Sequence, residues 1–162
     1  KKKKKKKNKG FFMRIFLKKI FLKKKIKFNI KQTNFSYNKK KYTLRGFHYQ
    51  KKPFSEDKIV SCVKGKLLVI LVDINKNSKN YLKHIKVVLS DDLNRSILIS
   101  KNCATAYLTL SNDTLVFYYM SNFFNKKKGS GFRYNDPRLN IKWPHKPNII
   151  SKKDMSYRNI KI

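Results

Sequence analysis

The sequence is poor in acidic residues, glycine, proline and cysteine, and it has no long apolar run. Asp and Glu number 8 against 42 Lys and Arg, which gives a formal net charge of +34 over 162 residues. Five Gly and four Pro are too few for a collagen-like or linker-like chain. The six-residue run Leu67–Val72 is as long as any apolar run, whereas a membrane-spanning helix needs about 20 residues. We therefore predict no transmembrane segment, and a hydrophobic content of 40% is enough for a folded core.

Several motifs for common chemistries are also missing. Cys62 and Cys103 lie far apart and no Cys/His cluster occurs, so we predict neither a metal site nor a disulfide framework. Two buried thiols and a cytoplasmic location fit this pattern better. The absence of glycine-rich phosphate loops and of a serine nucleophile elbow argues against dinucleotide-dependent hydride transfer, P-loop phosphoryl transfer and α/β-hydrolase chemistry.

The excess positive charge suggests nucleic acid or an anionic membrane as a partner. However, Lys outnumbers Arg 36 to 6, and Asn, Ile, Phe and Tyr are also abundant. AT-rich codons encode these residues, so a drift in base composition explains the charge. Proteins that read nucleic acid also favour Arg for its planar fork. We therefore predict no specific nucleic-acid partner, and a basic polyanion-binding protein remains the weaker alternative.

The N-terminal residues divide into a charged tail and a mixed segment. Residues 1–8 are almost all Lys and are expected to form a disordered tail. The hydrophobic residues that follow are interrupted by Arg14, Lys18 and Lys19, which excludes the apolar core of a signal peptide. Two interpretations stay open for this segment. It is either a cationic amphipathic helix on a membrane or a lead into a first strand and a short helix.

The rest of the chain has the pattern of short strands separated by turn signals. We expect strands over Tyr42–Gln50, Ile59–Val63, Leu67–Val72, Ile85–Leu89, Ile97–Ile99, Ala104–Leu110 and Leu115–Met120. Lys64–Lys66 and Ser111–Asp113 have the composition of hairpin connections. Lys126–Gly131 is expected to be a basic loop, followed by an irregular C-terminal region. The regular spacing of the strands favours a β-sandwich or a small barrel.

Few residues could carry acid–base chemistry. His48 lies in a predicted strand between aromatic residues and near Arg45. Taken by itself, such a histidine is more often structural than catalytic. Asp154 would by itself be a turn or surface acid. Tyr118 and Tyr119 must point to opposite faces of one strand, and the inward one could simply fill the core.

A series of sequence motifs along the chain changes the interpretation of these residues as merely structural. The segment Thr43–Gln50, TLRGFHYQ, resembles the signature of the dTDP-4-dehydrorhamnose 3,5-epimerases. Further blocks are similar to the same family in order and spacing: Lys58–Val60, Ala104–Leu110, Tyr118, Asn135–Pro137, Ile141–Pro144 and Ser151–Asp154. The resemblance extends over about residues 9–157, which is nearly the whole chain.

The resemblance implies an all-β, cupin-like jelly roll in a single domain over residues 9–162. It also implies a homodimer, with no metal and no cofactor. The implied substrate is a nucleotide-activated 4-keto-6-deoxy sugar of the dTDP-4-dehydro-6-deoxy-D-glucose type. Its 4-ketone acidifies the protons on C3 and C5. A base removes one of these protons, and an acid returns a proton to the opposite face.

The resemblance also assigns roles to individual residues. His48 is the expected base, Asp154 the residue that orients it, and Tyr118 the acid. Lys58 is expected to stabilise the enolate. The expected substrate-binding residues are Arg45, Phe12, Gln32, Asn34, Thr105, Phe123 and Lys153.

One departure from the family concerns Thr105, which stands where the family has a second active-site histidine. Threonine supplies no imidazole to bind or polarise the sugar. A catalytically weak or inactive sugar-nucleotide binder on the same fold is therefore kept as an alternative. The same departure leaves the exact sugar, and epimerisation at one position or two, undecided.

Overall fold

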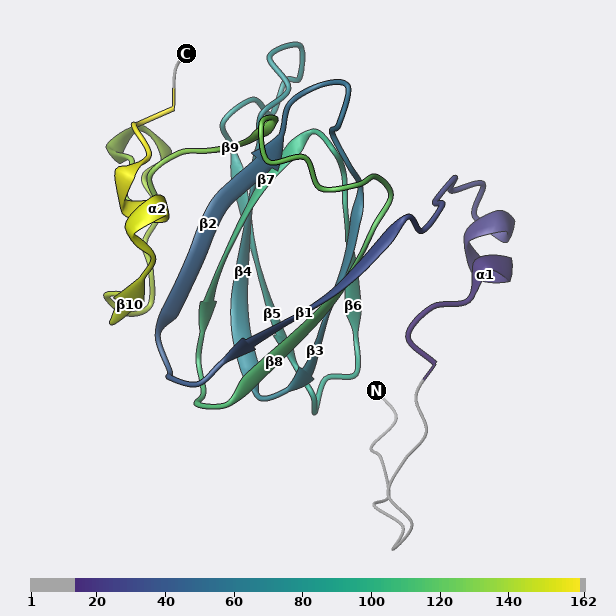
Figure 1. The fold of residues 1–162 in the computed structure, drawn as a ribbon, viewed down its shortest axis with the longest axis horizontal. Helices are drawn as coiled ribbons and strands as arrows, with labels where there is room; N and C mark the ends of the chain where they lie inside the picture. Colours follow the sequence, from purple (N-terminus) through teal and green to yellow (C-terminus); the bar gives the residue numbers. More distant parts are fainter. Residues whose placement is uncertain (1–13, 161–162) are drawn as a thin grey trace, which may run out of the picture.

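The computed structural model describes residues 14–160, which form two packed β-sheets with short helices at either side (Figure 1). The elements are α1 (Lys18–Lys23), β1 (Gln32–Asn38), β2 (Thr43–Gln50), β3 (Lys58–Lys64), β4 (Lys66–Asp73), β5 (His84–Ser90), β6 (Ser96–Ile99), β7 (Cys103–Thr109), β8 (Thr114–Met120), β9 (Gly129–Gly131), a 3-10 turn (Pro137–Leu139), β10 (Ile149–Ile150) and α2 (Lys152–Ser156). The predicted all-β jelly roll is confirmed. The predicted tail, residues 1–8, and the predicted binding residue Phe12 lie outside the described residues.

The strands alternate between the two sheets along much of the chain. One sheet has the order β1-β8-β3-β6, and the other has the order β10-β2-β7-β4-β5, with β9 also pairing with β2. Consecutive strands β3 and β4 therefore lie in different sheets, and so do β7 and β8. This arrangement is that of a double-sheet jelly roll.

The predicted hairpins at Lys64–Lys66 and Ser111–Asp113 are wrong. Both segments are corners at which the chain leaves one sheet for the other. Gly65 has a φ of +82° at the first corner, and a Cβ there would lie 2.5 Å from the Oγ of Ser111. Turn composition indicates a reversal of the chain, but it does not say whether the flanking strands pair. Lys126–Gly131, expected as a loop, contributes the short strand β9.

Two hydrophobic clusters lie on opposite faces of the six-stranded sheet. Between the sheets, Leu67, Val69 and Leu71 of β4 pack with residues such as Val60 and Val116. On the outer face, the alternate residues of β4 pack with Phe47, Phe132 and Leu139. Because both faces of β4 are buried, its sequence is continuously apolar rather than alternating.

The N-terminal segment packs on the outer face of the four-stranded sheet. Phe16 lies 5.1 Å from Phe21 and 5.5 Å from Tyr119, measured between ring centroids. Tyr119 thus points outward and Tyr118 inward, as strand alternation predicts. These contacts match the expected lead into a short helix and a first strand. None of the helices among residues 14–160 has the length and hydropathy to cross a bilayer.

Candidate active site

A β-bulge in β2 brings two functional side chains to the same face of the sheet. Arg45 pairs with Tyr107 of β7 and His48 pairs with Thr105, so the two residues between Arg45 and His48 face a single residue of β7. Without the extra residue, positions three apart would point to opposite faces. Gly46 makes the bulge possible, because its φ is +109° and a Cβ would lie 2.4 Å from the carbonyl oxygen of Thr105.

His48 is paired with Asp154, which lies 106 residues further along the chain. His48 Nε2 is 2.7 Å from Asp154 Oδ1, and the backbone N–H of Gly46 donates to Oδ2 at 3.1 Å. Asp154 lies in the first turn of α2, where its N–H donates to the capping hydroxyl of Ser151. The helix cap and the bulge together hold the carboxylate against the imidazole.

The charge of Asp154 follows from its surroundings. The Asp154 side chain is only 4% exposed, and burial alone would raise its pKa. The hydrogen bonds and charge of His48 and the N–H of Gly46 outweigh burial, so the pKa of Asp154 lies below its ordinary value. The ionised carboxylate can only accept hydrogen bonds. His48 therefore donates from Nε2, so that in the neutral form of the ring Nδ1 carries the lone pair that can accept a proton.

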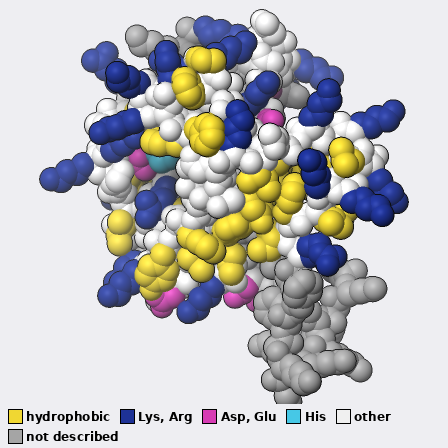
Figure 2. All heavy atoms as spheres, turned by 45° about the vertical axis from the view of Figure 1, so that its right-hand side comes forward, with side chains coloured by type: hydrophobic (Ala, Val, Ile, Leu, Met, Phe, Trp, Pro, Cys, Tyr) yellow, Lys and Arg dark blue, Asp and Glu magenta, His cyan; other side chains and the backbone are white. Residues whose placement is uncertain are grey.

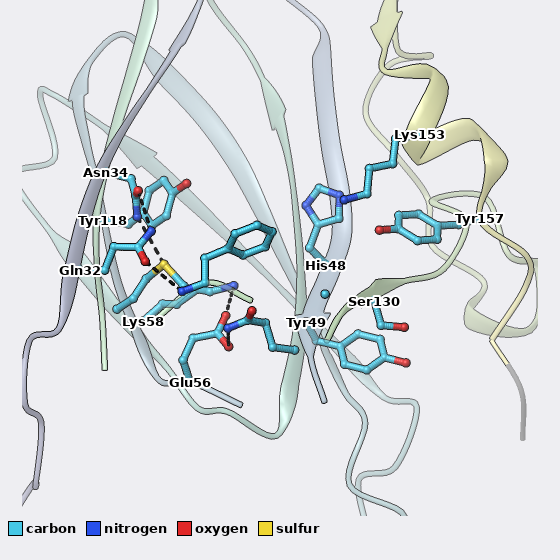
Figure 3. Close-up of a pocket in the computed structure, with 14 residues that line it drawn as sticks. Gln32, Asn34, His48, Tyr49, Glu56, Lys58, Tyr118, Ser130, Lys153 and Tyr157 are labelled. Carbon is cyan, nitrogen blue, oxygen red and sulfur yellow. Dashed lines mark hydrogen bonds and ion pairs between the residues drawn. The ribbon is translucent and has the colours of Figure 1, made fainter. Parts of the chain in front are cut away.

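His48, Lys58 and Tyr118 line two adjoining cavities between the sheets. The first has a volume of 340 Å³ and the second of 440 Å³, and these three residues are common to both. Figure 3 shows the first cavity with Gln32, Asn34 and Tyr118 on one side and His48 on the other. The histidine comes from β2 and the tyrosine from β8, so the two groups stand on facing sheets.

Polar side chains from neighbouring strands of the four-stranded sheet lie side by side on the face that lines the first cavity. Gln32 of β1 pairs with Met120 of β8, which in turn pairs with Lys58 of β3. Asn34 pairs with Tyr118 in the next inward-facing row. Gln32 donates to Asn34 Oδ1 at 3.0 Å and accepts from the N–H of Phe124 at 2.9 Å. One face of the sheet is thereby turned into a polar wall.

Tyr118 is kept in its protonated form by its surroundings. Burial raises the pKa of its phenol, and the nearby Tyr107 and Glu56 raise it further, against a smaller lowering by Arg45. A neutral phenol can donate a proton or a hydrogen bond into the cavity. Tyr118 is thus available as an acid on the wall that faces His48.

Most of the predicted site residues converge on the cavities. Gln32, Asn34 and Lys153 line the first, and Arg45 and Thr105 line the second. Phe123 lines neither and is 57% exposed, whereas the neighbouring Phe124 lines the first cavity. Among the described residues, Thr105 Oγ1 is a buried side-chain oxygen without a hydrogen-bond partner.

Sequence reasoning missed Glu56 and Gln50, which are both buried and line the first cavity. Glu56 forms an ion pair with Lys58, and Gln50 donates to the same carboxylate. Gln50 ends the Thr43–Gln50 block, and an acid two residues before a lysine was the signal for Glu56, which carried little weight in so basic a chain. Within residues 14–160, no group of three His, Cys, Asp or Glu side chains could hold a metal ion.

Comparison with known proteins decides the family. The family model for dTDP-4-dehydrorhamnose 3,5-epimerase matches residues 1–161. The chain belongs to this epimerase family. A family member from Shigella flexneri is 35% identical over 150 residues, covering 91% of this chain and 81% of the relative. Another, from Methanothermobacter thermautotrophicus, is 31% identical and covers 94% and 83%.

Solved structures of family members agree with the fold. A dTDP-4-dehydrorhamnose 3,5-epimerase from Bacillus anthracis, crystallised with TDP and pyrophosphate, superposes with a TM-score of 0.92 at 30% identity and covers 95% of this chain and 88% of that one. An epimerase from Legionella pneumophila, in complex with dTDP-4-keto-L-rhamnose, has a TM-score of 0.89 at 29% identity, with coverages of 94% and 81%. Both likenesses extend over the two sheets that carry the candidate site.

Proposed function

We propose that this chain, as a single domain over residues 9–162, epimerises a nucleotide-activated 4-keto-6-deoxy sugar of the dTDP-4-dehydro-6-deoxy-D-glucose type. The observation that carries the proposal is the position of His48 and Tyr118 on facing sheets around shared cavities. Family membership and the ligands of the two solved relatives support the substrate class. Inversion at carbon requires a proton to leave one face of the sugar and return to the other.

His48 is the proposed base. Its Nδ1 lone pair takes a proton from C3 or C5, and the C–H electron pair moves to form the enolate on O4. The imidazolium that results is stabilised by the Asp154 carboxylate 2.7 Å from Nε2. Asp154 also holds the ring in the tautomer that leaves Nδ1 unprotonated, and so determines which nitrogen can act.

Tyr118 and Lys58 complete the proposed reaction. The Lys58 ammonium, half-buried beside both cavities, is placed to stabilise the negative charge that develops on O4. When the enolate collapses, the Tyr118 hydroxyl gives a proton to the carbon from the face opposite His48. The C–H bond forms again with inverted configuration. Before the next turnover the His48 imidazolium releases the proton that it took, and the tyrosinate regains one from solvent.

The cations around the cavities suit the diphosphate of the substrate. Arg45 lines the second cavity and Lys153 the first. Arg45 Nε donates to Asn38 Oδ1 at 2.9 Å, which fixes the base of its guanidinium while its end remains exposed. Gln32, Asn34 and the Thr105 hydroxyl are the proposed neutral contacts to the sugar and the nucleotide.

Proton NMR in heavy water with dTDP-4-keto-6-deoxyglucose tests the proposal. We expect deuterium to enter at C3, C5 or both, and a His48→Ala variant to lose about 10²–10⁴-fold in exchange rate. His145→Ala is the matched control, since His145 is exposed and stacks on Tyr42 outside both cavities. Binding without exchange in the unmutated protein would instead identify an inactive sugar-nucleotide binder.

We further propose that two copies pair through the β1 edge of the four-stranded sheet and the part of its outer face next to that edge. β1 is an edge strand among the described elements, and Phe35 and Tyr37 on it are 66% and 56% exposed. Figure 2 shows hydrophobic side chains gathered on this side of the molecule, with Lys and Arg around them. An open strand edge beside an apolar patch suits a second copy of the same surface. Sedimentation equilibrium should give a dimer that Phe35→Lys weakens.

A further inference from the structure

Glu56 is a buried carboxylate in the candidate site to which the proposed reaction gives no role. Its side chain is 2% exposed and lies just before β3, at the edge of the first cavity. Oε1 is 2.9 Å from the Lys58 ammonium, and Oε2 accepts from Gln50 Nε2 at 3.0 Å. Both oxygens are thus engaged with residues that line the same cavity, as Figure 3 shows.

Gln50 ties this carboxylate to the surrounding backbone. Its amide nitrogen also donates to the carbonyl oxygens of Phe54 at 2.9 Å and Phe123 at 3.1 Å. Its oxygen accepts from the N–H of Asn125 at 2.6 Å. The carboxylate is therefore bound by a Gln50 side chain that is itself fixed to the loops that follow β2 and β8, so its position has an anchor independent of Lys58.

We propose that Glu56 is a positioning residue, which holds the Lys58 ammonium at the point where the enolate oxygen develops. A lysine side chain has four rotatable bonds and loses that freedom only when its end is anchored. Electrostatic stabilisation of a transition state depends on charges that are already in place before the reaction. Glu56 supplies that anchor, and its own charge balances the ammonium while the site is empty. This inference rests on the epimerase reaction proposed above.

Glu56→Gln is the informative substitution. An amide has one acceptor oxygen where the carboxylate has two, so its NH₂ group must face either the ammonium or the Gln50 amide. The Lys58 ammonium then loses its charged partner with little change in volume. We expect kcat for exchange to fall about 10–100-fold while KM for the nucleotide sugar changes by less than about two-fold. Glu56→Asp, which keeps the charge, should recover part of kcat.

A double-mutant cycle with Lys58→Met separates positioning from a structural effect. If Glu56 acts through Lys58, adding Glu56→Gln to Lys58→Met should lower kcat by less than about two-fold further. Asp136→Asn is the matched control, because Asp136 is also buried and also pairs with a cation two residues away, Arg138, at 2.7 Å. It lines neither cavity, so it should lower stability and leave kcat unchanged.

The outcomes distinguish this inference from the proposed function. An equal loss from Glu56→Gln in both backgrounds, or a rise in KM without a fall in kcat, would overturn the positioning role. If the unmutated protein is active and Glu56→Gln has the same kcat, the positioning role is overturned as well, but the epimerase proposal stands. An unmutated protein without exchange would remove the epimerase proposal itself.

Discussion

Replacing Asp154 by Asn tests whether the carboxylate sets the tautomer of His48. The carboxylate accepts two hydrogen bonds, from His48 Nε2 at 2.7 Å and from the Gly46 N–H at 3.1 Å, while 4% exposed. An amide can accept only one of them. If its oxygen faces Gly46, its NH₂ faces Nε2, and the imidazole proton must move to Nδ1. The nitrogen that is proposed to take the substrate proton is then occupied.

The expected size of the effect follows from this loss. Replacing the carboxylate that orients a catalytic histidine by an amide costs about 10⁴-fold in a serine protease triad, and loss of a general base costs about 10²–10⁴-fold. We therefore expect kcat to fall within about 10²–10⁴-fold, or about 2.7–5.4 kcal/mol of transition-state free energy. The opposite amide orientation keeps the proton on Nε2, but it leaves the buried Gly46 N–H unpaired, at about 1–3 kcal/mol, and a neutral amide does not stabilise the imidazolium as the carboxylate does.

Deuterium exchange at C3 and C5 of the sugar, followed by NMR, measures this change directly. Circular dichroism and the urea midpoint show whether the variant is folded. The double variant with His48→Ala should be no slower than His48→Ala alone, because both changes disable the same group. A single Asp154→Asn variant that exchanges within about two-fold of the unmutated rate would refute this reasoning.

Two further predictions concern stability and substrate contact. Burial raises the pKa of Asp136, but its hydrogen bonds with Arg138 and the Ile160 N–H lower it below the ordinary value. In the unfolded chain the Asp136 carboxyl binds its proton at a higher pH than in the folded protein. The free energy of unfolding, measured with urea, should therefore fall as the pH drops below about 4, and it should fall less steeply in Asp136→Asn. Thr105→Val removes a buried hydroxyl without a protein partner. The urea midpoint should stay unchanged or rise. KM should rise about 2–12-fold, which corresponds to the free energy of one lost hydrogen bond to the sugar.

The sequence by itself located most of the strands, and its family resemblance pointed to the candidate site residues. Strand positions follow from local composition, so the ends of β3, β4, β7 and β8 lie within a residue or two of those predicted. The ordered blocks from Thr43–Gln50 to Ser151–Asp154 indicated the family, and the family model confirms it. Strand positions and motifs depend on short stretches of chain, because the pattern of neighbouring residues determines them.

Only the tertiary structure decided how these pieces meet. Glycine and polar residues mark a turn, but the packing of the two sheets determines whether the strands on either side pair or separate, as at Lys64–Lys66. The bulge after Arg45 reverses the alternation that a simple strand predicts, and so brings Arg45 and His48 to one face. The contact of His48 with Asp154 was expected only through the family resemblance, because no local pattern encodes which distant carboxylate will reach a given imidazole; the structure supplies its geometry.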